Sequence, residues 1–193
     1  MKNPNNRPRT FFTADTHFGH RGVLKMCARP FADAAEMDEL LIERWNSVVR
    51  KCDVVHHLGD FALNSSAARC QEIFARLNGT KHLVRGNHDK PRHLELPWAS
   101  PPEDLRTVHV DGRRIVLCHY AFRTWRGSWQ GALHLYGHSH GALPGTSRST
   151  DVGTDCWGYR PVELGEILER MEATPVPPEE AALAAERDDG EAE

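Results

Sequence analysis

Five short polar segments, each at the end of an apolar run, constrain the fold of this chain more than any other feature. In order along the 193 residues they read TADTHFG, HLGDF, RGNHD, LCHY and YGHSH. A sheet fixes the position of a loop that directly follows one of its strands, so side chains on several such loops can converge although they are distant in sequence. We therefore expect a fold in which several strand ends meet at one place.

The side chains in these segments are suited to binding divalent metals. Aspartate, asparagine and histidine offer oxygen or nitrogen to a borderline-hard cation, and the five segments contain enough donors for two ions. Each segment alone has an ordinary explanation as a loop, a turn or half of a zinc site. All five in one order are much harder to explain by chance. The combined pattern predicts a pair of metal ions, which in proteins usually serves phosphate-ester chemistry.

The same five segments, in the same order, resemble the calcineurin-like metallophosphoesterase superfamily, whose pattern is DxH, GD, GNH[DE], a lone His and GHxH. The resemblance covers roughly residues 10–165. The chain has little sequence between the segments and no obvious cap domain, which is typical of a small, single-domain member from a bacterium or a phage. The resemblance implies an α/β fold, an αββα sandwich of two mixed sheets lying face to face with helices outside.

The resemblance also implies a set of metal ligands. Those of the first ion would be Asp15, His17, Asp60 and His140, and those of the second Asp60, Asn87, His119 and His138. Asp60 would bridge the two ions through its two oxygens. A donor set of nitrogen and oxygen without thiolate suits Mn, Fe, Zn, Co or Ni better than Ca or Mg alone, and manganese is our first expectation. A hydroxide bridging two such ions would attack phosphorus at neutral pH.

Two further residues are expected to take part in catalysis. His88 resembles the family histidine that faces the phosphoryl group without binding metal, and in its protonated form it would donate to the leaving oxygen. Asp89 follows it and either holds the imidazole in orientation or is an exposed aspartate of a turn.

Substrate contacts are expected on either side of the metal ligands. His20 and Arg21 follow the first ligand pair and are candidates for the rim of the site, although His20 can equally be an ordinary loop histidine. Tyr120, Arg123 and Arg126 lie in the segment YAFRTWRGSWQG, whose cations and aromatic rings suit stacking of a ring and binding of a phosphate. The alternative is that the aromatic residues of this segment pack a long loop onto the domain.

The function expected from these observations is hydrolysis of phosphoesters by a two-metal enzyme. A phosphodiesterase acting on small or nucleotide-type substrates is slightly preferred, and a phosphomonoesterase or a nuclease of DNA or RNA stays open. A net charge of −3 supplies no general attraction to nucleic acid. A non-catalytic scaffold that binds protein partners is disfavoured because no ligand of the pattern is missing.

Periodicity predicts the order of the elements. Short β-prone runs at 10–14, 53–58 and 81–84 alternate with helical spacing at 35–50 and 65–77, which indicates parallel strands joined by crossover helices. Two runs at 105–110 and 113–118 flank Asp111-Gly112, the signature of an antiparallel hairpin. Further strands are expected at 132–136 and 149–154, and a strand followed by a helix at 161–171.

The chain is expected to form one metallophosphoesterase domain at 10–173, between a flexible N-terminus at 1–9 and an acidic, disordered tail at 174–193. No apolar run approaches the length that spans a bilayer, and the N-terminus lacks the apolar stretch of a secretory signal. We therefore expect a cytoplasmic protein without a membrane partner.

Overall fold

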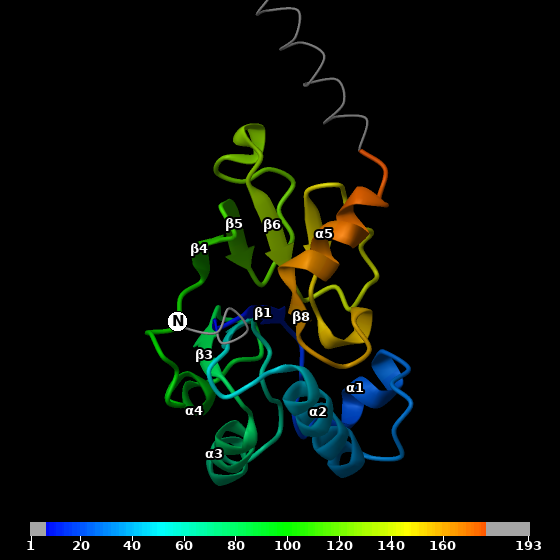
Figure 1. The fold of residues 1–193 in the computed structure, drawn as a ribbon. Helices are drawn as coiled ribbons and strands as arrows, with labels where there is room; N and C mark the ends of the chain where they lie inside the picture. Colours follow the sequence, from blue (N-terminus) through cyan, green and yellow to red (C-terminus); the bar gives the residue numbers. More distant parts are fainter. Residues whose placement is uncertain (1–6, 177–193) are drawn as a thin grey trace, which may run out of the picture.

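Eight strands within residues 7–176, the part of the chain that the computed structural model describes, form two four-stranded sheets (Figure 1). The first has the order β3-β2-β1-β8 and comprises β1 (Thr10–Thr13), β2 (Val54–His57), β3 (Thr80–Leu83) and β8 (Val162–Glu163). The second has the order β4-β5-β6-β7 and comprises β4 (Leu105–Val110), β5 (Arg113–Cys118), β6 (Leu133–Tyr136) and β7 (Ser149–Asp151). Both sheets are mixed: β8 is antiparallel to β1 and β4 to β5, while the other pairings are parallel. The predicted α/β fold with two mixed sheets is confirmed.

Two helices cover the outer face of the first sheet. They are α2 (Ala34–Val48) and α3 (Ala67–Arg76), which match the predicted helices closely. Asp33 caps α2 by accepting from the amides of its first turn. Ser66 caps α3 by accepting from the Arg69 amide. Satisfying amides that have no partner within the helix fixes where each helix begins.

Three short or late helices complete the element order: α1 (Arg21–Met26), α4 (Pro91–Leu94) and α5 (Leu164–Glu172). The first two were not predicted, because helices this short carry little periodicity for a sequence pattern to reveal. The last follows β8 directly, as expected, and contacts both β1 and β7, so it bridges the two sheets along one side.

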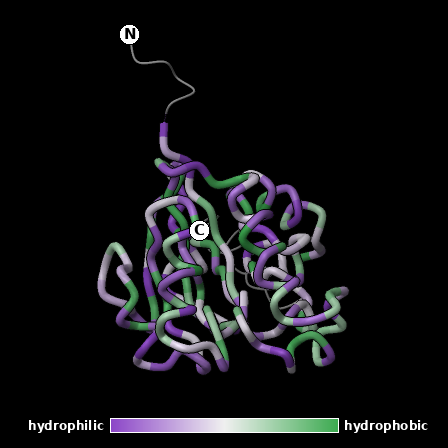
Figure 2. The backbone as a smooth tube through the Cα atoms, turned by 90° about the horizontal axis from the view of Figure 1, so that it is seen from below, coloured by the Kyte–Doolittle hydropathy of each residue, from purple (hydrophilic) through white to green (hydrophobic). Residues whose placement is uncertain are grey.

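Strand residues alternate between two buried layers. Phe11 packs with the α2 side chains Leu41 and Trp45 on one face of the first sheet, whereas Phe12 faces the second sheet and packs with Leu117 and its neighbours. This alternation follows from the pleat of a strand, which points successive side chains to opposite faces. Figure 2 shows hydrophobic and hydrophilic residues alternating along much of the backbone, as expected for elements that bury one side.

A loop, rather than a long helix, covers the outer face of the second sheet within residues 7–176. His134 of β6 is buried there under Phe122, whose ring stacks on it with centroids 5.0 Å apart. The Trp125 indole donates to the Ala132 carbonyl at 2.9 Å. The segment 119–131, with the short 3₁₀ helix η2 (Ser128–Gln130), is therefore anchored by its aromatic residues. For Phe122 and Trp125 the packing alternative is confirmed.

The predicted flexible N-terminus and acidic tail lie mostly outside the described residues. Arg9, however, is firmly held: its amide and guanidinium donate to the Asp53 carboxylate at 2.9 and 3.1 Å, and its guanidinium also donates to Glu163 at 2.7 Å. Arg50 donates to the same Asp53 carboxylate from its amide and its guanidinium. Asp53, whose side chain is fully buried, thus ties the start of β1 to the segment that precedes β2.

We expect Asp53→Asn to lower the free energy of unfolding by about 1.5–3 kcal/mol, because an amide cannot replace the charge that Arg9 and Arg50 bind. Burial alone would raise the pKa of Asp53, but hydrogen bonds from Arg50 and Arg9 outweigh it and hold this pKa below its usual value of 3.8. The contribution of the Asp53 carboxylate to the free energy of unfolding is therefore complete above about pH 4 and is lost as the pH falls further. Urea unfolding across this pH range would measure it. Asp104→Asn, at the exposed pair with Arg85, is the matched control.

Candidate metal centre

Strand ends from both sheets meet at one place. β1, β2 and β3 are parallel, so the residues that follow them, among which are Asp15, Asp60 and Asn87, leave the first sheet at the same edge. β5 and β6 are likewise parallel, and His119 and His138 follow their ends. The geometry predicted from the five polar segments is thus produced by parallel pairing within each sheet.

Asp60 lies at the middle of the group. One of its oxygens, Oδ2, is 3.6 Å from His17 Nε2 and 3.5 Å from His119 Nε2. The other oxygen, Oδ1, accepts from the amide of His88 at 2.8 Å. The amide fixes the carboxylate so that Oδ2 faces histidines from two different strand ends.

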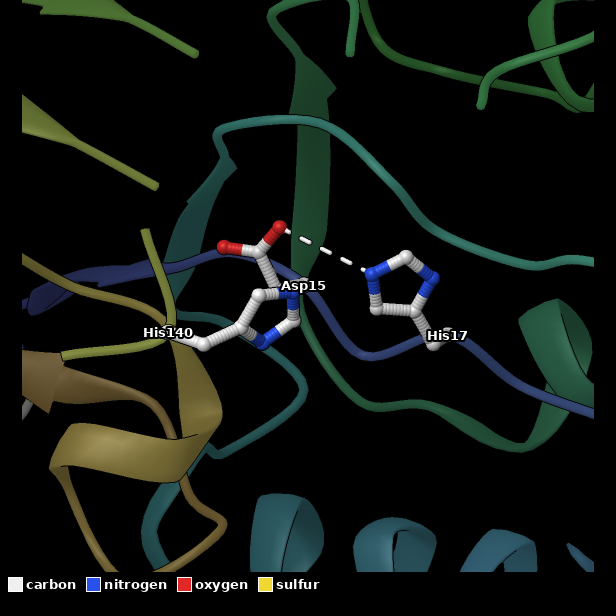
Figure 3. A group of neighbouring side chains, drawn as sticks. All are labelled: Asp15, His17 and His140. Atoms are coloured by element: carbon white, nitrogen blue, oxygen red, sulfur yellow. Dashed lines mark ion pairs between the residues drawn. The ribbon is translucent and has the colours of Figure 1, made fainter. Parts of the chain in front are cut away.

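The donors assigned to the first ion approach one another closely. Donor atoms of Asp15, His17 and His140 all lie within 4.8 Å of one another (Figure 3). Asp15 Oδ1 is 3.9 Å from His17 Nε2, and the rings of His17 and His140 stack with centroids 5.2 Å apart.

The donors assigned to the second ion form an adjoining group. Asp60 and His119, together with Asp15 of the first group, have donor atoms within 4.8 Å of one another. His119 Nε2 is 3.0 Å from Asn87 Oδ1, and the His119 and His138 rings have centroids 5.1 Å apart. All seven predicted ligands therefore belong to one cluster, buried at Asp15 and Asp60 and exposed at Asn87 and His138.

The residues of the first group fit a cation. Within residues 7–176, Asp15 Oδ1 and both nitrogens of His17 are buried without a hydrogen-bond partner, an arrangement that costs about 1–3 kcal/mol for each group. Burial first, and then the neighbouring His140 and Arg29, lower the pKa of His17 to about 2, so its imidazole is neutral and able to bind metal. Burial and the charges of Asp151 and Asp60 raise the pKa of Asp15. A cation bound here would offset the negative charge of these carboxylates.

Hydrogen bonds orient two of the ligand rings. His119 Nδ1 lies 2.7 Å from the Leu58 carbonyl, which can only accept, so Nδ1 carries the proton and Nε2 is left for a metal. His140 Nδ1 lies 2.8 Å from Asp155 Oδ2, which fixes that ring in the same way.

Backbone strain concentrates at the ligands. Asp15, His17, Asp60, His138 and His140 all have φ between 48° and 68°, in the left-handed region that side chains rarely adopt. Such residues cost about 1–3 kcal/mol each and persist only where the surroundings hold them. Five of the nine non-glycine residues with positive φ in the described part of the chain are predicted ligands, so the strain marks this site and not the loops in general.

A glycine permits the closest approach of the loops. Gly59 has a φ of 93°, and a Cβ at this position would lie 2.6 Å from both Gly86 Cα and His119 Nδ1. The turns after β2 and β3 therefore touch through their backbones beside a ligand ring, which leaves no room for a side chain between them.

Arg29 and Asp155 support the first group and were missed by the sequence analysis. The Arg29 guanidinium donates to both Asp155 oxygens, at 2.8 and 2.7 Å, and to the Asp15 carbonyl at 2.7 Å. Asp155 in turn accepts from His140. Arg29 is separated from Asp155 by 126 positions and belongs to none of the five segments, so no motif indicated it.

Asp151 was missed as well. Its Oδ2 accepts from the Ser139 hydroxyl at 2.7 Å and from the Gly141 amide at 3.0 Å, and its Oδ1 accepts from the Gly153 amide. It thereby fixes the loop that presents His138 and His140.

Asp89 differs from both sequence-based expectations. Its carboxylate accepts from the amides of Asp60, Phe61 and Gly86 at 2.9 to 3.0 Å. It also lies 3.5 Å from His93 Nδ1, and its side chain is fully buried. It is therefore not an exposed turn residue, and the described contacts of its carboxylate are to main-chain amides and His93, where orientation of the His88 ring was expected. Asp89 instead joins the loop that follows β2 to the loop that follows β3.

His88 lies where the expected proton donor would be. Its Nε2 is 4.0 Å from Asp60 Oδ2, and its ring is partly exposed. Together with His17, Asp60 and His138 it lines an open cavity of about 360 Å³ above the ligand cluster. A substrate in this cavity would meet His88 beside the metal ligands.

Two of the five predicted substrate contacts lie next to the ligands. The His20 ring is 5.3 Å from that of His17, and the Tyr120 ring is 5.1 Å from that of His119. Arg21, Arg123 and Arg126 are exposed and do not line the cavity. The segment 119–131 leads away from the strand ends toward the start of β6 (Figure 1). Arg123 and Arg126 belong to this segment, which explains why they do not line the cavity.

Comparison with known proteins assigns the family. The model of the calcineurin-like phosphoesterase superfamily domain matches residues 10–177. The chain belongs to this superfamily. Among its relatives, the uncharacterized protein MJ1445 of Methanocaldococcus jannaschii is 31% identical over 170 residues, covering 84% of this chain and 90% of the relative. The Gene 66 protein of Mycobacterium phage D29 is 30% identical over 193 residues, with coverage of 83% and 94%.

A solved structure supports the fold. The protein of unknown function AQ665 from Aquifex aeolicus superposes with a TM-score of 0.66 at 22% identity, covering 83% of this chain and 98% of that one. As a calcineurin-like phosphoesterase, the protein is a metal-dependent hydrolase of phosphate esters, and the clustered donors described above are its candidate metal-binding residues. Within residues 7–176 no helix is both long and apolar enough to cross a lipid bilayer.

We expect Asp60→Ala to lose most of the bound metal, because Asp60 is the carboxylate between the two donor groups. Metal content per chain, measured by elemental analysis after loading and gel filtration, would show the loss. Asp104→Ala, at an exposed position outside the centre, should retain the wild-type content. Two ions per chain in Asp60→Ala would contradict the ligand assignment.

Asp155→Asn should weaken binding of one metal ion about 10- to 100-fold, the scale found for residues that orient a metal-binding histidine. The other ion, whose donors do not contact Asp155, should keep its affinity. Titration with a metal and a competing chelator would resolve the two steps, and equal weakening of both would argue against a local effect on His140.

Proposed function

We propose that this phosphoesterase is a two-metal phosphodiesterase acting on small or nucleotide-type diesters. The observation that carries the proposal is the position of Asp60 Oδ2, at 3.6 and 3.5 Å from histidines of the two donor groups. One oxygen at similar distances from both groups would suit a bridge between two ions, whereas the expected bridge through both oxygens is disfavoured because Oδ1 accepts from the His88 amide.

The donor chemistry supports a particular range of ions. Imidazole nitrogen with carboxylate and amide oxygen suits Mn, Fe, Zn, Co or Ni, and manganese is our first choice among these ions. When bound there, two such ions would supply Lewis-acid chemistry, offsetting charge on the phosphate and acidifying a water molecule toward neutral pH.

The protein's own residues would perform three tasks. The His88 amide holds Asp60 Oδ1, and the Leu58 carbonyl holds His119, so the centre is oriented before substrate arrives. The protonated His88 ring, at the cavity wall, would donate to the leaving oxygen as the ester bond breaks. Asn87 contributes an uncharged oxygen, which limits negative charge near an anionic substrate.

Charge favours a diester over a monoester. The side chains that line the cavity within the described part of the chain include no lysine and no arginine. A phosphomonoester carries a second negative charge near neutral pH, and the protonated His88 ring would be the one side-chain cation of the described lining available to balance it. A diester carries one negative charge and leaves less for the metal centre to offset.

A direct comparison of substrates tests the proposal. Protein freed of metal and reloaded with manganese would be assayed with bis(p-nitrophenyl) phosphate and with p-nitrophenyl phosphate. Faster turnover of the bis-ester is expected. Turnover of the monoester alone would reject the diesterase assignment, and absence of turnover with each of the five metals would reject phosphoester hydrolysis.

His88→Ala should lower kcat by about two to four orders of magnitude, the usual contribution of general acid catalysis. Metal content should stay near that of the wild type, because alanine keeps the amide that holds Asp60. His109→Ala, an exposed histidine on β4, is the matched control. An unchanged kcat in His88→Ala would remove the ring from the reaction.

A further inference from the structure

Large apolar side chains are exposed around the mouth of the metal centre. Within the described residues, six large hydrophobic side chains are exposed: Met26, Leu105, Tyr120, Trp129, Leu143 and Val176. Met26 lines the cavity, Tyr120 contacts two ligand rings, and Leu143 follows the cavity residue Ala142. Met26 and Tyr120 thus lie beside one small cavity, with Leu143 next in sequence to a residue of its lining, and exposed apolar groups that cluster in this way mark binding surfaces.

Tyr120 forms one side of the mouth. Its ring meets His119 and His138 in edge-on contacts with centroids 5.1 and 4.9 Å apart, and 45% of the residue stays exposed. The ligand rings therefore support the tyrosine without covering it. A ring supported in this way can stack against a planar group.

Met26 and Leu143 belong to two other segments, which contribute Met26 and Ala142 to the cavity lining. Met26 ends α1 and is 66% exposed, although it borders the cavity that contains His88 and Asp60. Leu143 is 47% exposed. The thioether of methionine interacts favourably with aromatic rings, and its flexible chain adapts to different ring positions.

The charged residues nearby leave this surface apolar. Arg21 and Lys25 of α1 do not line the cavity. Arg29 is buried, and its guanidinium donates to Asp155 and to main-chain carbonyls. The mouth therefore offers an organic group apolar contact and offers it little electrostatic attraction.

We propose that Met26, Tyr120 and Leu143 form an apolar rim that binds a planar aromatic arm of a phosphodiester, the arm that does not leave in the reaction. This inference rests on the proposed diesterase function and specifies its substrate class: diesters that carry an aryl or nucleoside group next to the phosphate. A polar arm such as that of a glycerol or sugar diester would leave the rim uncovered. Stacking of one ring on an aromatic side chain is worth about a tenfold change in affinity.

Two substrates with the same leaving group test the rim. Bis(p-nitrophenyl) phosphate and ethyl p-nitrophenyl phosphate both release p-nitrophenol, but they retain an aryl and an ethyl arm respectively. The measured quantity is the ratio of their kcat/KM values in each variant relative to the wild type, which cancels the intrinsic reactivity of the substrates. We expect Tyr120→Ala and Met26→Ala each to lower this ratio about 5- to 10-fold, chiefly through the KM of the aryl substrate.

Trp129→Ala is the matched control. Trp129 is also an exposed aromatic residue of the segment 119–131, but it lies in η2, just before the start of β6, whereas the ligand loop follows the end of β6. The ratio of the two kcat/KM values in Trp129→Ala should equal that of the wild type. A wild-type ratio in both Tyr120→Ala and Met26→Ala, with diesters still hydrolysed, would overturn the rim and leave the proposed function intact.

Binding gives a readout independent of turnover. Met26 has the one exposed methionine side chain among residues 7–176, since Met37 and Met171 are buried. The protein would be loaded with zinc and kept free of manganese, and the ¹³C-labelled methyl resonance of Met26 would be assigned by its loss in Met26→Ala. This resonance should shift on addition of diphenyl phosphate and not on addition of diethyl phosphate. Equal responses to both would overturn the rim. If no ester is hydrolysed while the aryl-specific shift occurs, the proposed function fails and the apolar binding site stands.

Discussion

The position of one carboxylate, that of Asp60, determines how the rest of the centre is arranged. Its Oδ1 is held by the His88 amide and its own amide is held by Asp89, so neither the side chain nor the main chain can rotate freely. Oδ2 then faces histidines that come from the first sheet and from the second. A carboxylate held less firmly would leave two separate groups of donors with nothing to connect them.

Rigid sheets hold the candidate ligands in conformations that are unfavourable by themselves. Five ligands have left-handed backbone conformations, and several buried donor atoms lack hydrogen-bond partners within the described part of the chain. Both features oppose folding. Apolar layers pack on either side of the first sheet, and the loops touch at Gly59. Together these contacts hold the strained residues in place. The stability of the fold therefore offsets the strain that the metal centre requires.

The clustering of the candidate ligands and most strands and helices could be predicted from the sequence, because these features depend on short patterns. The ligands lie within five compact segments, and helices such as α2 show the periodicity of a buried face. The support of the ligands was not predictable in this way. Arg29 meets Asp155 across 126 positions. Asp89 was expected to orient its sequence neighbour His88, but its oxygens accept from amides of the loop after β2 as well as from its own loop. Such contacts depend on how loops cross in space, which periodicity does not reveal.

The aromatic anchoring of the segment 119–131 has a consequence for how this architecture can diversify. Phe122 and Trp125 hold the segment against β6, while its first residue after the candidate ligand His119 is Tyr120, beside the cluster of metal-binding candidates. Residues inserted between Tyr120 and Phe122 would lengthen the chain next to the entrance, while the Phe122 and Trp125 rings kept the rest of the segment on β6. Length variation at this point would reshape access to the reactive centre while the machinery beneath it stayed constant, so one scaffold can be adapted to successive substrates by lengthening a single connection.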